Sequence, residues 1–254
     1  MKINIASDHV KLGQAAGKTA GRLILEAIQR RGSANIILAT GTSQFETLSQ
    51  LINEKEIDWS KVVMFHLDEY IGLPITHRAS FRKYLKERFL SKVSPLKAAY
   101  LIDGGNEVKA ECDRLGNLIK QHPIDVALVG IGENGHLAFN DPPANFETDD
   151  PYITVNLDEN CRKQQLGEGW FESIEEVPRQ AISMSVSQIL KSTHIVCSVP
   201  DKRKALAVKN TIEQKVTNLY PASILQSHKN CILFLDQHSA SILNEERMHY
   251  HNEL

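Results

Sequence analysis

Short apolar runs alternate along the chain with segments in which apolar residues recur every three or four positions. The runs are typical of strands buried on both faces of a sheet, and the longer period is typical of helices that cover such a sheet. The expected strands are 35–39, 62–67, 99–102, 126–129, 181–184, 194–199 and 232–235. The expected helices are 8–31, 43–54, 80–89, 107–121 and 201–209. In the first helix, Ser7 and Asp8 can cap the beginning and Gly32 can form the end.

The alternation of strands and helices predicts a doubly wound α/β fold, with a mainly parallel sheet and helices on both faces. Right-handed crossovers place every strand-to-helix loop at one edge of that sheet. No repeat, low-complexity tract or linker divides the chain, so residues 1–254 are expected to form a single domain. The polar segment 142–178 is a candidate lid, in which Gly167, Gly169 and Trp170 could hinge and cover a pocket.

Composition narrows the expected partners to small molecules. The chain has 42% hydrophobic residues and a formal net charge of −2, so it can bury a large core but has no excess positive charge for nucleic acid or a membrane surface. No signal peptide and no bilayer-spanning segment are expected. The four cysteines form no Cys-x-x-Cys pair, which disfavours a zinc ribbon. These features predict a cytoplasmic enzyme, with a homo-oligomer left open.

The turn Thr40-Gly41-Thr42-Ser43 lies between an expected strand and an expected helix. Backbone N–H groups at the start of a helix, together with hydroxyl groups, can bind a phosphate. The alternative is an ordinary helix start that Ser43 caps. Lys204 also follows a strand and can point toward the same phosphate, although its alternative is a solvated helix lysine.

Two adjacent carboxylates, Asp68 and Glu69, follow another apolar strand directly. A carboxylate at a strand end that faces a crevice can serve as a general base. The alternative is a structural role, in which either residue caps the turn or pairs with a cation such as Arg78.

A glycine-rich loop follows the strand 126–129 and contains Glu133, Asn134, His136 and Asp141. Its glycines permit close approach of the backbone to a ligand. Asp141 could orient His136 and stabilise its imidazolium form, so the loop is predicted to transfer protons. A metal site made of Glu133, His136 and Asp141 is less favoured, because a second histidine at suitable spacing is missing.

Four motifs together resemble the glucosamine-6-phosphate deaminase (isomerase) family. They are ATGTS at 39–43, LDEYIGLP at 67–74, GIGENGHLAFNDP at 130–142 and KALA at 204–207. They follow the order and approximate spacing of that family over nearly the whole chain. The resemblance implies the Rossmann-like fold shared with 6-phosphogluconolactonases and, more distantly, ribose-5-phosphate isomerases. It also implies conversion of glucosamine 6-phosphate and water to fructose 6-phosphate and ammonia, without a redox cofactor or metal.

The resemblance also assigns roles to residues. In this family a histidine with two polar partners opens the sugar ring, which implies His136, Asn134 and Asp141 here. The first carboxylate of the DEY motif, here Asp68, moves a proton from C2 to C1. Substrate binding is implied for Thr40, Gly41, Thr42, Ser43, Gly132 and Lys204.

The chain departs from the family pattern at four points. Many members have Asp at the position of Asn134 and Glu at that of Asp141, so Asn134 is expected only to orient groups while Asp141 supplies the negative charge. Thr42 stands where a second glycine is common. A phosphate-binding arginine of bacterial members has no clear counterpart, and Arg162 is the nearest candidate.

Three other functions compete with glucosamine 6-phosphate deamination. Galactosamine 6-phosphate, the C4 epimer, is an alternative substrate. Hydrolysis of 6-phosphogluconolactone would predict Thr-Ala-Ser after the histidine loop in place of LAFND. A sugar-phosphate sensor without turnover would carry a DNA-binding or partner module, and the presence of Asp68 and His136 favours catalysis instead.

Overall fold

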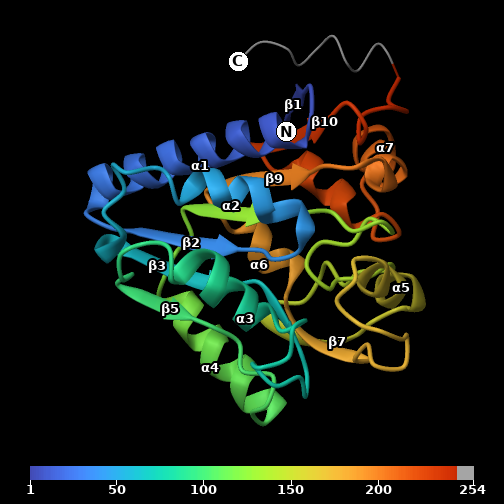
Figure 1. Cartoon of the computed structure of the whole chain (residues 1–254), viewed down its shortest axis with the longest axis horizontal. Coiled ribbons are helices and arrows are strands. Elements are labelled where there is room, and N and C mark those ends of the chain that lie inside the picture. Colours follow the sequence, from blue (N-terminus) through green and yellow to red (C-terminus); the bar gives the residue numbers. More distant parts are fainter. Residues whose placement is uncertain (245–254) are drawn as a thin grey trace.

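The computed structural model describes residues 1–244, in which seven parallel strands form the central sheet. The strands are β1 (Lys2–Ala6), β2 (Ala34–Leu38), β3 (Val62–His66), β5 (Ala98–Tyr100), β6 (Val126–Val129), β9 (His194–Val199) and β10 (Cys231–Asp236). Their order is β1–β10–β9–β6–β2–β3–β5, which runs from beside the N-terminus to the opposite edge in Figure 1. The mainly parallel α/β sheet expected from the sequence is confirmed.

Helices cover both faces of this sheet. They are α1 (His9–Arg31), α2 (Phe45–Leu51), α3 (Phe81–Leu85), α4 (Val108–Lys120), α5 (Glu159–Gly167), α6 (Val186–Leu190) and α7 (Ala205–Glu213). Short turns are η1 (Thr42–Gln44), η2 (Trp59–Lys61), η4 (Lys202–Lys204) and η5 (Pro221–Ser227), and α3 continues as a π-helical turn, η3 (Lys86–Leu90). Ile36 and Leu38 of β2 pack in the core formed with α1 and α2, whereas Ile37 packs in the core formed with α4 and α7. Burial on both faces explains the continuous apolar runs.

Helix α1 begins and ends as the sequence predicts. The Asp8 carboxylate accepts a hydrogen bond from the Lys11 N–H at 2.8 Å. Gly32 has a φ of 80°, and its N–H donates to the Ile28 carbonyl at 2.7 Å. In the described part of the chain, no helix is long and apolar enough to span a membrane.

A second, antiparallel sheet takes up the expected strand 181–184, which therefore lies outside the parallel sheet, and joins it to two segments that were not expected to be strands. It has the order β4–β8–β7, with β4 (Asp68–Tyr70), β8 (Gln180–Met184) and β7 (Tyr152–Asn156). Strands β1, β4 and β7 and helix α5 were not predicted. β1 and β7 expose part of their side chains, and α5 is largely polar, so their sequences lack the long apolar runs of the central strands.

The strand order reverses between β2 and β6. From β2 the chain continues outward through β3 to β5, and from β6 it continues outward on the other side through β9 to β10. Ligands of open α/β sheets bind beyond the carboxyl ends of the strands at such a reversal. Figure 1 shows α5 beyond the arrowheads at this edge. The topology therefore brings the loops after β2 and β6 and helix α5 to one end of the sheet.

Candidate active site

A cavity of about 60 Å³ lies where these loops meet. The sequence-predicted residues that line it are Thr40, Gly41, Thr42, Ser43, Asp68, Gly132, His136 and Lys204. Residues that the sequence analysis did not select also line it, among them Phe81, Gln164, Gln165 and Glu168. The structure therefore joins side chains from the loops after four strands and from α5 in one site.

The turn after β2 is held from outside the cavity. Gly41 has a φ of 93°, a conformation that favours glycine, and its carbonyl accepts a hydrogen bond from the Tyr84 hydroxyl at 3.0 Å. Ser43 lies inside the turn η1 and makes no capping bond to a helix, so its alternative role as a helix cap is wrong. The first N–H groups of a helical turn lack partners within it, which leaves those of this turn for an anion.

Asp68 lies at the start of β4 with its carboxyl group facing the cavity. Its side chain is buried, and this burial, together with the neighbouring charge of Glu69, raises the pKa of Asp68 to about 8. A carboxyl group with a pKa near neutral pH can both accept and return a proton. The environment of Asp68 therefore suits reversible proton transfer.

The adjacent Glu69 points the other way and has a structural role. Its carboxylate accepts hydrogen bonds from the Ser80 hydroxyl at 2.9 Å and from the N–H groups of Phe81 and Arg82 at 3.2 and 2.8 Å, so it caps the start of α3. The cation beside it is Arg82, with Nε 3.5 Å from Oε2. The expected partner Arg78 is wrong, because its guanidinium lies near Glu172 and the Trp170 carbonyl instead.

We expect Glu69→Gln to destabilise the protein by about 1–3 kcal/mol, because one acceptor oxygen of a buried, multiply bonded group is replaced by a donor. The free energy of unfolding in urea measures this effect. Glu107→Gln is the matched control, since Glu107 caps α4 in the same way but is exposed, and it should change stability much less. Equal losses in the two variants would contradict the structural role of Glu69.

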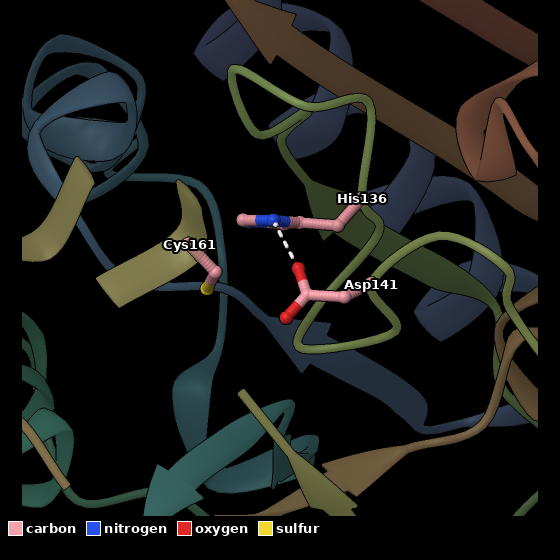
Figure 2. A group of neighbouring side chains, drawn as sticks. All are labelled: His136, Asp141 and Cys161. Atoms are coloured by element: carbon pink, nitrogen blue, oxygen red, sulfur yellow. Dashed lines mark ion pairs between the residues drawn. The ribbon is translucent and has the colours of Figure 1, made fainter. Parts of the chain in front are cut away.

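His136 and Asp141 form a buried pair in the loop after β6 (Figure 2). The ring Nδ1 lies 3.0 Å from Asp141 Oδ1, although the two groups are not aligned as in a hydrogen bond. Burial raises the pKa of Asp141, but the contact with His136, together with the hydrogen bonds from Asn134 and the Asp158 N–H, outweighs it and lowers this pKa below its ordinary value. A Cβ at position 132 would lie 2.3 Å from the His136 ring, so only glycine leaves room for the ring there.

Asn134 connects this pair to α5. Its side-chain NH2 donates to Asp141 at 2.9 Å and to Asp158 at 3.2 Å, and its carbonyl oxygen accepts from the His136 N–H at 3.1 Å. Asp158 caps α5 and was not selected from the sequence, where its signal was only that of a helix N-cap. An amide suits this position, because an aspartate at 134 would bring a third negative charge to two existing carboxylates.

Glu133 does not belong to a metal site. Its carboxylate lies 3.4 Å from the Arg203 guanidinium. Within residues 1–244, the residues that could share an ion are His136, Asp141 and Cys161, whose ligand atoms all lie within 4.8 Å of one another (Figure 2). Burial and then the charge of Asp141 raise the pKa of the Cys161 thiol well above its ordinary value. Metals bind the thiolate, so this cluster is better suited to hold protons than a metal.

Of the two cations considered for phosphate binding, Lys204 reaches the cavity and Arg162 does not. Lys204 is buried at the cavity, and burial lowers its pKa. Arg162 does not reach the cavity, so its candidacy as a phosphate ligand is wrong. Its guanidinium donates to the carbonyls of Ile174 and Val177 and so ties α5 to the segment that follows it.

The side chains of α5 that reach the cavity are Gln164, Gln165 and, just after the helix, Glu168. Gln164 accepts from the Glu133 N–H at 2.8 Å and donates to Glu168 at 2.9 Å. In the sequence these residues resemble a solvated polar helix, and no local pattern marks them as part of a site. Only the position of α5 beyond the strand ends reveals them (Figure 1).

Comparisons with known proteins agree with this geometry. The model of the family "glucosamine-6-phosphate isomerases/6-phosphogluconolactonase" matches residues 7–234. A glucosamine-6-phosphate deaminase of Streptococcus suis is 38% identical over 92% of this chain and 98% of that protein. One of Oenococcus oeni is 35% identical over 97% of this chain and 100% of that protein.

Solved structures show the same fold. A monomeric glucosamine-6-phosphate deaminase superposes with a TM-score of 0.87 at 29% identity, covering 95% of this chain and 100% of that one. The 6-phosphogluconolactonase of Trypanosoma brucei superposes with a TM-score of 0.77 at 14% identity, covering 96% of this chain and 98% of that one. At that identity the likeness concerns the fold alone.

Proposed function

Because the chain belongs to the family of glucosamine-6-phosphate isomerases and 6-phosphogluconolactonases, we propose that it is a glucosamine-6-phosphate deaminase. It would convert glucosamine 6-phosphate and water to fructose 6-phosphate and ammonia. The observation that carries this proposal is that Asp68 and His136 line one cavity together with the turn 40–43 and Lys204. Two proton-transfer groups and an anion-binding turn are what an aldose–ketose conversion of a sugar phosphate requires.

His136 is the proposed catalyst of ring opening. One proton leaves the anomeric hydroxyl and one is delivered to the ring oxygen, which breaks the C1–O5 bond and forms the open-chain aldehyde. Asp141 lies beside the ring Nδ1 and orients the imidazole of His136, and Asn134 holds Asp141 in place. A carboxylate at one ring nitrogen fixes the orientation of an imidazole, which leaves the other ring nitrogen to exchange a proton with the substrate.

Asp68 is the proposed catalyst of the next step. Its carboxylate removes the proton from C2 of the open-chain sugar while the aldehyde oxygen O1 takes up a proton from solvent, which leaves an enolamine across C1 and C2. The proton then returns to C1, and the resulting imine at C2 is hydrolysed by water to the ketone and ammonia. The turn Thr40-Gly41-Thr42-Ser43 and Lys204 would hold the phosphate, so that its binding energy positions C1 and C2 beside Asp68.

The test is ammonia release from glucosamine 6-phosphate and galactosamine 6-phosphate, beside hydrolysis of 6-phosphogluconolactone. We expect the purified protein to release ammonia from glucosamine 6-phosphate with the highest kcat/KM. A higher kcat/KM for galactosamine 6-phosphate or for 6-phosphogluconolactone would show that this compound, and not glucosamine 6-phosphate, is the substrate. Binding of these phosphates without turnover of any would favour the sensor function.

The segment 142–178 is proposed to be a lid. In its support, α5 lies within this segment and lines the cavity, whose volume of about 60 Å³ is small beside the roughly 300 Å³ or more of ligand sites. Limited proteolysis near Gly167 should slow when glucosamine 6-phosphate is present, and equal cleavage with and without it would argue against a lid.

The cytoplasm is the proposed compartment, since the four cysteines are free thiols.

A further inference from the structure

Glu168 places a carboxylate beside the turn that is proposed to bind phosphate. A Cβ added to Gly41 would lie 3.9 Å from Glu168 Oε2. The carboxylate is held there from α5 and from the segment after it: Gln164 Nε2 donates to Oε1 at 2.9 Å, and Trp170 Nε1 donates to Oε2 at 3.2 Å. These two hydrogen bonds therefore fix the position of the Glu168 carboxylate, which does not rotate freely like a surface side chain.

The cavity also contains the cation that this carboxylate balances. Lys204 is 6% exposed, and a buried ammonium group is costly without a compensating negative charge. Among the described residues, Lys204 makes no direct ion pair, and the charges that favour its protonated form most are those of Glu168 and then Glu133. Glu168 therefore supplies the negative charge that a bound phosphate would supply at the same lysine.

The carboxylate and a phosphate cannot both remain at this position. Two like charges a few ångströms apart in a poorly solvated site repel each other strongly. The cavity of about 60 Å³ is small for a hexose phosphate while Glu168, Gln164 and Gln165 line it. A phosphate that reaches Gly41 and Lys204 must therefore displace Glu168.

We propose that Glu168 is a specificity-determining placeholder for the substrate's phosphate group. Its carboxylate balances Lys204 before substrate binds, and the incoming phosphate takes over that charge as the Glu168 side chain leaves the cavity. A neutral sugar cannot replace the lost negative charge, so the exchange selects for phosphorylated substrates. This inference rests on the proposed function in that the displacing anion is the phosphate of the sugar.

The test is binding of inorganic phosphate to Glu168→Gln, measured by titration calorimetry. Glutamine keeps the size of the side chain and one acceptor oxygen but removes the competing charge. We expect inorganic phosphate to bind about tenfold more tightly, which corresponds to about 1.4 kcal/mol, and the KM for glucosamine 6-phosphate to fall. Glu175→Gln is the matched control, since Glu175 is an exposed acid of the same segment, and it should leave both values unchanged.

A double variant tests whether the effect of Glu168 on phosphate binding acts through Lys204. In a Lys204→Met background, Glu168→Gln should no longer tighten phosphate binding, because the shared cation is gone. Unchanged or weaker phosphate binding in the single variant would overturn the proposal. So would a raised KM for glucosamine 6-phosphate with unchanged phosphate binding, which would mean that Glu168 recognises the amino group. Phosphate binding needs no turnover, so a protein that releases no ammonia would refute the proposed reaction while leaving this test intact.

Discussion

Asp68→Asn is expected to lower kcat for ammonia release from glucosamine 6-phosphate by about a thousandfold or more, because an amide cannot remove the C2 proton. Inorganic phosphate should still bind, since the turn 40–43 and Lys204 are unchanged. A coupled assay for ammonia measures the loss, and Asp113→Asn, on the exposed face of α4, is the control that should retain activity. Loss of less than tenfold would exclude Asp68 as the base.

The same carboxyl group predicts how activity and stability depend on pH. Its pKa is raised from 3.8 to about 8, so the wild-type kcat/KM should rise with pH and level off above about 8. The folded state binds this proton more tightly than the unfolded state. The stability that Asp68 contributes is therefore present below about pH 4 and is lost as the pH rises to about 8.

The asparagine side chain is neutral at every pH, so Asp68→Asn should be more stable than the wild type at high pH, although it is expected to be inactive. We expect Asp68→Asn to exceed the wild type by about 1–3 kcal/mol at pH 8.5, the cost of a poorly compensated buried polar group, and to match it near pH 4. Thermal melting at the two pH values measures the difference. A variant that is less stable than the wild type at pH 8.5 would show that Asp68 is stabilised as a carboxylate.

His136→Gln is expected to lower kcat/KM for glucosamine 6-phosphate by about a hundredfold to ten-thousandfold, because glutamine cannot carry the proton between the anomeric hydroxyl and the ring oxygen. His238→Gln removes an exposed histidine and serves as the control. Steady-state kinetics of the two variants gives the comparison, and equal kcat/KM values would remove His136 from the mechanism.

A second measurement distinguishes His136 from Asp68. Exchange of the C1 hydrogen of fructose 6-phosphate in deuterated water, with ammonium present, requires proton transfer at carbon but no opening of the glucosamine ring. His136→Gln should therefore retain more of this exchange than of deamination, whereas Asp68→Asn should lose both equally. Equal loss of both reactions in His136→Gln would mean that His136 acts at carbon as well, or only holds the fold.

Much of the fold can be predicted from the sequence because the central strands are buried on both faces. β2, β3, β6, β9 and β10 are short and apolar, and a strand of this kind in an α/β chain directs the loop after it to one known edge. From the sequence alone, that rule predicts that Thr40, Asp68 and His136 lie at one place. The same rule does not find β7 and α5, because their sequences are polar and resemble those of solvent-exposed segments.

The sequence by itself determined which chemical groups follow the central strands, because the period of apolar residues and the direction of the crossovers depend on local order along the chain. Only the tertiary structure decided what each group does. Asp68 and Glu69 are neighbours of the same type, yet one faces a cavity and the other caps α3. Asn134 acquires Asp158 as a partner, and Lys204 shares its cavity with Glu168, from the two ends of a helix that the sequence did not mark. Burial and charge partners set a proton affinity, and these come from segments far apart in the chain.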